Sequence, residues 1–80
     1  MSNILQFKKE GWYWGYLDID GVIHVKRYVN DRAIENAERS GFTQGIFEPF
    51  QAQTLEIAKQ MCYEQMHEQR NVHWKNKPNT

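Results

Sequence analysis

A β-hairpin is predicted by the stretch Gly11-Trp-Tyr-Trp-Gly-Tyr-Leu-Asp-Ile-Asp-Gly-Val-Ile-His-Val-Lys-Arg-Tyr28. β-Branched and aromatic residues fill both arms of this stretch, and Asp and Gly gather at its centre, where a tight turn would reverse the chain. The hairpin therefore brings five aromatic residues and the pair Lys26-Arg27 into one small sheet. This is the part of the chain where the sequence predicts a binding surface.

The turn at Asp18-Ile-Asp-Gly21 allows two registers, which differ in the side chains that share a face of the sheet. A two-residue type I′ loop would pair Ile19 with Val22, and the face with the tryptophans would be mostly core. A three-residue loop with a bulge would pair Asp18 with Val22 instead. We favour the three-residue loop, because Asp18 can bond the backbone two residues on and Gly21 takes a positive φ without strain.

In the favoured register, one face of the hairpin is an aromatic strip edged with positive charge. Trp, Tyr and Arg are enriched at the hot spots of protein interfaces, and aromatics with cations on a sheet also stack bases in single-strand-binding modules. The ordinary alternative is that these aromatics are core, or cover the short helix that follows. We predict the partner-binding residues to be Trp12, Trp14, Tyr16, His24, Lys26, Arg27 and Tyr28.

The composition favours a protein partner over a nucleic acid. The chain has 80 residues, and its ten basic and ten acidic residues cancel, so it lacks the positive field that dominates nonspecific nucleic-acid binding. The amino terminus has no apolar run typical of a signal peptide, and Cys62 is a lone cysteine. We therefore expect a soluble cytoplasmic protein that does not bind a membrane, whose oligomeric state the sequence leaves open.

Two helices and a further strand are predicted after the hairpin. Capping residues and apolar spacing indicate helices over about 31–40 and 54–69. The segment 42–50, with Pro49 near its end, is typical of a strand that must end or lie at an edge. In the second helix an apolar stripe should face the sheet, with Met61 at its margin and these members: Leu55, Ala58, Cys62 and Met66.

The order strand, strand, helix, strand, helix predicts a small single α+β domain. Its antiparallel sheet would have three strands, or four if residues 1–9 add to an edge, and the C-terminal helix would pack on it. We expect this domain to span residues 1–70. Residues 71–80 contain His73, Lys75 and Lys77 and no acidic residue, and we expect them to form a flexible basic tail.

The sequence carries no signature of a catalytic, metal, cofactor or small-molecule site. Cys62 and His67 lie about 140° apart around the predicted helix, so they do not converge on one metal ion. His24 has no nucleophile placed beside it by the sequence. Asp18 and Asp20 lack the later oxygen ligands of a calcium loop, and no glycines form a phosphate-binding loop. We expect a protein that is not an enzyme.

Residues 11–66 resemble small uncharacterised proteins of phage and prophage genomes, in the run Gly15-Tyr-Leu-Asp-Ile-Asp-Gly-Val-Ile-His-Val-Lys-Arg-Tyr28, in Ile46-Phe-Glu-Pro-Phe-Gln-Ala52 and in the helix with Ile57-Ala58. The resemblance implies an accessory role directed at the host, such as inhibition of a defence complex by binding it. Phe50-Gln-Ala52 is also similar to the arm-binding domains of phage integrases, from which the helix at 31–40 and the neutral charge depart. We therefore expect a protein-binding module, with a small nucleic-acid-binding domain as the alternative.

Overall fold

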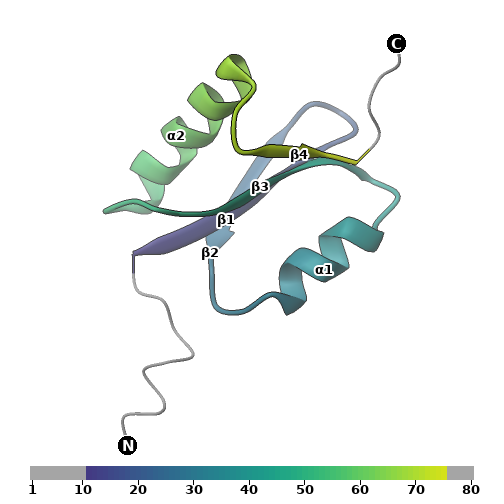
Figure 1. Ribbon diagram of the computed structural model, residues 1–80, viewed down its shortest axis with the longest axis horizontal. Helices are drawn as coiled ribbons and strands as arrows, with labels where there is room; N and C mark the ends of the chain where they lie inside the picture. Colours follow the sequence, from purple (N-terminus) through teal and green to yellow (C-terminus); the bar gives the residue numbers. More distant parts are fainter. Residues whose placement is uncertain (1–10, 76–80) are drawn as a thin grey trace, which may run out of the picture.

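A computed structural model describes residues 11–75, in which a four-stranded antiparallel sheet lies between two helices (Figure 1). The strand order is β2-β1-β3-β4, with β2 and β4 at the edges. The α+β class and the predicted order of the first five elements are confirmed. The elements are β1 (Trp12–Asp18), β2 (Ile23–Arg27), α1 (Arg32–Arg39), β3 (Thr43–Gln51), α2 (Leu55–Glu68) and β4 (Val72–Trp74).

The hairpin closes with the three-residue loop, as the sequence predicted. The Asp18 N–H donates to the Val22 carbonyl over 2.9 Å, and the Gly21 N–H donates back to the Asp18 carbonyl over 2.9 Å. Gly21 has a φ of +87°, which other residues adopt only with strain. The carboxylate of Asp18 also accepts from the backbone N–H groups of Asp20 and Val22 at 2.9 Å each. The turn residues thus fix the register of β1 with β2.

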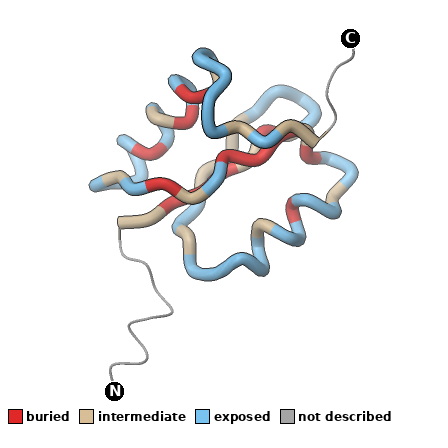
Figure 2. The backbone as a smooth tube through the Cα atoms, in the orientation of Figure 1, coloured by how far each residue is buried: buried red, intermediate tan, exposed pale blue. Residues whose placement is uncertain are grey.

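Each face of the sheet carries a core of its own, and the buried residues follow β1 and β3 through the middle of the molecule (Figure 2). The smaller core, under α1, consists of Trp14, Ala37 and Ile46. Gly15 points to the opposite face, where a Cβ would lie 2.6 Å from the His24 carbonyl oxygen, so no larger residue fits there. The larger core, under α2, consists of Tyr13, Leu17, Phe47, Phe50, Ala58 and Cys62.

Helix α2 begins where its cap was predicted, because the Thr54 hydroxyl accepts from the Ile57 N–H over 3.1 Å. Its buried stripe differs from the prediction at Leu55 and Gln65, while Met66 packs against the larger core as expected. Leu55, the first residue of the helix, is 42% exposed and does not belong to the larger core. Gln65 is buried instead, and its side-chain oxygen accepts from the Asn71 amide over 3.1 Å. A polar residue is tolerated there because it has this partner.

Residues 72–74 form a strand where the sequence analysis expected a flexible tail. Gln69 and Asn71 take left-handed backbone conformations and turn the chain back toward the sheet. β4 then pairs antiparallel with β3, with Trp74 opposite Gly45. The predicted boundary at residue 70 is therefore too early, while residues 1–9 and 76–80 lie outside the described part of the chain.

The thiol of Cys62 should be inert in the folded protein. It is fully buried under the sheet, and burial raises the pKa of the Cys62 thiol to about 12. At neutral pH, a rise from 9.0 leaves about a thousandfold less thiolate, which is the reactive form. We expect iodoacetamide to label Cys62 only after denaturation with urea, as measured by intact mass. Labelling at the same rate in native buffer would contradict this burial.

Candidate functional site

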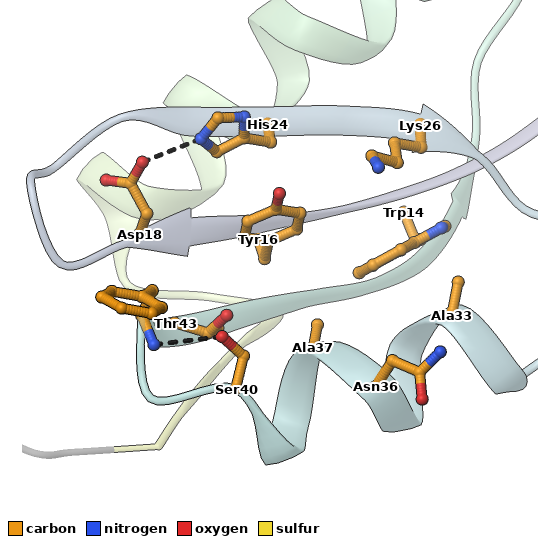
Figure 3. A pocket seen from close by; sticks show the side chains of 11 residues that line it. Trp14, Tyr16, Asp18, His24, Lys26, Ala33, Asn36, Ala37, Ser40 and Thr43 are labelled. Carbon is orange, nitrogen blue, oxygen red and sulfur yellow. Dashed lines mark hydrogen bonds and ion pairs between the residues drawn. The ribbon is translucent and has the colours of Figure 1, made fainter.

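A groove of about 530 Å³ lies between α1 and the open face of the β1–β2 hairpin (Figure 3). It exists because α1 packs against β3 and leaves β2 uncovered on this side. The helix presents mainly small side chains, so it does not fill the space itself. The lining residues are Trp14, Tyr16 and Asp18 from β1, His24 and Lys26 from β2, Ala33, Asn36 and Ala37 from α1, and Ser40, Phe42 and Thr43 beyond it.

Stacked rings form the sheet side of the groove. The rings of Tyr16 and His24 lie 4.6 Å apart at 15°, and Trp14 lies 5.8 Å from Tyr16 in a tilted arrangement. The ammonium of Lys26 stands 6.0 Å from the centre of the Tyr16 ring. Tyr16 and His24 stay partly exposed, and such rings lose little conformational entropy when a ligand covers them. The groove can therefore take an apolar or aromatic side chain next to an anionic one.

At the end of the groove nearest the hairpin turn, Asp18 and His24 are in hydrogen-bond contact. The Asp18 carboxylate lies 2.8 Å from Nε2 of His24, and these two side chains are 19% and 38% exposed. The hydrogen bond with His24 and the backbone N–H bonds of the turn together lower the pKa of Asp18 below its ordinary value of 3.8. Asp18 therefore connects the turn to the groove, since its carboxylate accepts from backbone N–H groups of the turn and contacts His24 in the groove.

We expect the Asp18→Asn variant to melt at a lower temperature than the native protein at pH 7, with the gap closing in acid. A depressed folded-state pKa gives stability that is present above the unfolded-state pKa and is lost as the pH falls through the folded value. Asn keeps one oxygen for the turn but has no charge to titrate. Melting curves by circular dichroism from pH 7 to pH 3 measure the gap. A gap of constant size across this range would contradict the assignment.

Exposed apolar side chains surround the hairpin turn at this end of the groove. Phe42 is 71% exposed, Ile19 51% and Val22 50%. Their backbones are close neighbours, because the Ile19 N–H donates to the Phe42 carbonyl over 3.0 Å and Val22 closes the same turn. We call these three residues the tip patch. Apolar side chains grouped next to a groove are typical of a protein-binding surface.

The structure brings together some of the predicted site residues and separates others. Tyr16, His24 and Lys26 lie in the groove as accessible side chains. Trp14 also borders it but is only 2% exposed, so the expected exposure of the aromatic strip is wrong at this residue, because α1 covers it. Arg27 pairs with Tyr13 and so points to the α2 face of the sheet.

The other two predicted residues lie at the opposite end of the hairpin from the turn. The Tyr28 N–H donates to the Trp12 carbonyl over 2.9 Å, and both residues are half-buried. The Tyr28 hydroxyl donates to the Asp31 carboxylate over 2.7 Å, which raises the pKa of Tyr28. Neither residue lines the groove. The predicted site residues thus lie in three places. Some line the groove, Trp12 and Tyr28 lie at the end of the hairpin away from the turn, and Arg27 lies on the opposite face of the sheet.

Sequence reasoning missed the helix side of the groove and its mouth. The spacing of Ala33, Ala37 and Ser40 signals a small-residue helix face, but only the fold shows that this face looks onto the hairpin. Phe42 follows Gly41 shortly after the helix, and its side chain is 71% exposed. Across residues 11–75, no group of three or more His, Cys, Asp or Glu could hold a metal ion. Neither helix of the described chain is long and apolar enough to cross a membrane.

No protein-family model, curated protein or solved structure matches this chain.

Proposed function

We propose that this protein is a non-enzymatic protein-binding module that holds its partner in the groove and on the tip patch. The observation that supports this most is the position of the tip patch at the end of the groove, since Phe42 belongs to both. The partner would meet an apolar anchor point beside stacked rings and the Lys26 cation. This mixture of anchors is typical of protein interfaces.

The geometry favours a protein over a nucleic acid. A base-stacking platform needs open ring faces, but Trp14 is buried under α1 and Tyr16 already stacks on His24. The two cations of the hairpin do not act together, because Lys26 lies on the groove face and Arg27 on the other. The resemblance to phage proteins suggests a host defence or regulatory protein as the partner.

Affinity capture with matched variants tests the proposal. Immobilised native protein, Phe42→Ser and Tyr63→Ser would be exposed to lysate of the source cell, and bound proteins quantified by mass spectrometry. Tyr63 is a suitable control because it is 58% exposed on α2, away from the groove. Loss of a hot-spot side chain costs about 2 kcal/mol, which is about thirtyfold in affinity. We expect one host protein that binds the native and Tyr63 forms and is lost from the Phe42 form.

Two results would overturn the proposal. One is capture that Phe42→Ser leaves unchanged, which would place the interface elsewhere. The other is tight binding of single- or double-stranded oligonucleotides that weakens steeply between two salt concentrations, because such a slope reports phosphate contacts.

A further inference from the structure

The outer edge of β2 is open to a further strand. The backbone groups of Val22 and Tyr28 form hydrogen bonds with β1. In an antiparallel pair every second residue does so, and His24 and Lys26 are therefore the residues between them whose backbone groups face β1. The N–H and C=O groups of Ile23, Val25 and Arg27 therefore point away from the sheet. Within residues 11–75, no strand pairs with this edge, and Pro and bulges are missing from it. Such an edge is a template for strand addition.

The side chains along this edge leave apolar surface for a guest strand to cover. Ile23 and Val25 face α2, which lies over β2, and both side chains remain half-buried. On the other face, His24 is half-buried and Lys26 is exposed beside the groove. A strand paired with β2 would place its alternate residues on these two faces. It would extend both the larger core and the groove floor.

The charge of β2 selects the guest. β2 carries Lys26 and Arg27 and no acidic residue, although the whole chain is neutral. Lys26 lies on the groove face and Arg27 on the α2 face, so a guest carboxylate would find a cation on either side. Opposite charges on neighbouring strands are favourable and like charges are not. A second copy of this chain is disfavoured as the guest, because its β2 carries the same cations.

We propose that β2 takes up an extended acidic segment of the partner protein as a fifth strand of the sheet. The inference rests on the proposed function, and it adds how the partner is held. Backbone bonds to Ile23, Val25 and Arg27 give the affinity, and side chains give the selectivity. The segment places carboxylates beside Lys26 and Arg27 and apolar residues beside Ile23 and Val25. The groove and the tip patch receive residues of the partner outside this strand.

Selection from a peptide library tests the chemistry of the guest. Displayed random peptides of about ten residues, the length of a long strand, would be selected on the native protein, on Lys26→Glu/Arg27→Glu and on Lys59→Glu/Arg39→Glu. The control pair makes the same change of charge on α2 and α1. We expect acidic, β-prone peptides to outnumber basic ones by about tenfold on the native and control proteins, with the preference reversed on the β2 variant. Enrichment of basic peptides on the native protein, the same preference on all three, or no enrichment, would overturn the proposal.

Amide hydrogen exchange with the best selected peptide tests the geometry. Strand addition should slow the exchange of the Ile23, Val25 and Arg27 amides by about tenfold or more, because each gains a hydrogen bond. Peptide binding without this protection would overturn strand addition. If Phe42→Ser still abolished capture of the partner, the proposed function would stand and only this inference would fail. Protection of the same amides that rises with protein concentration in the absence of peptide would identify a second copy as the occupant and also overturn the proposal.

Discussion

The Trp14→Ala variant is expected to lose about 3–5 kcal/mol of unfolding free energy, the usual loss when a buried Trp is truncated. Trp14 is 2% exposed and forms the centre of the smaller core with Ala37 and Ile46. This core is small, so its neighbours cannot collapse into the space of an indole. The loss is a large part of the roughly 5–15 kcal/mol that stabilises a typical domain. Urea unfolding followed by circular dichroism measures it.

A control for this prediction is the Tyr63→Ala variant, which removes an aromatic ring that is 58% exposed on α2. Its free energy of unfolding should change by no more than about 0.5 kcal/mol. If Trp14→Ala unfolded at the same urea concentration as this control, α1 would not cover the tryptophan. The groove would then lack its helix side, and the proposed function would lose its site. The measurement therefore tests the position of α1 as well as one side chain.

Local chemistry was sufficient to predict the hairpin and the start of the second helix. Asp18 and Gly21 fix a three-residue loop through bonds within the turn itself, and Thr54 caps α2 through the N–H of Ile57. These interactions join residues that are close in the sequence, so their spacing is visible without a fold. The same locality explains why the face shared by Tyr16, His24 and Lys26 was predicted correctly, because it follows from the register alone.

The position of α1 could not be predicted in this way. Its apolar residues, Ala33, Ile34 and Ala37, are few and small, and they do not indicate which part of the sheet they cover. In the structure α1 lies toward β3, with Ala37 and Ile34 in contact with the smaller core, so Trp14 is buried while Tyr16 stays accessible. The groove is a consequence of this offset between helix and hairpin. It depends on tertiary packing, which no single segment of the sequence encodes.

β4 was missed because its signal is short and its turn is unusual. Three residues, Val72–Trp74, alternate apolar and polar, which is too few to separate from a tail. The turn before it uses left-handed Gln69 and Asn71 rather than glycine. The site that receives Trp74 is also inconspicuous, since Gly45 offers only the space left by a missing side chain. A Cβ added at Gly45 would lie 3.2 Å from the nearest indole carbon of Trp74.

A chain that ends at Arg70 is therefore expected to lose about 3 kcal/mol or more of unfolding free energy, from Trp74 burial and from backbone bonds worth about 1 kcal/mol each. Trp74 packs against the larger core. The Lys75 N–H donates to the Gln44 carbonyl over 2.9 Å, and its ammonium donates to the Ser40 carbonyl over 2.7 Å. The deletion removes all of these contacts. Urea unfolding by circular dichroism gives the loss.

A chain that ends at Lys75 is the matched control, because it keeps β4 and every contact just described. We expect its unfolding midpoint to stay within error of the native protein, so that the whole loss falls on residues 71–75. Equal midpoints for the two truncated chains would mean that β4 adds nothing to stability and that the domain ends at residue 70 after all.

Because Lys75 bonds the carbonyl of Ser40 at the end of α1, the shorter chain should also bind the partner more weakly. Loss of β4 would then loosen the helix that forms one side of the groove.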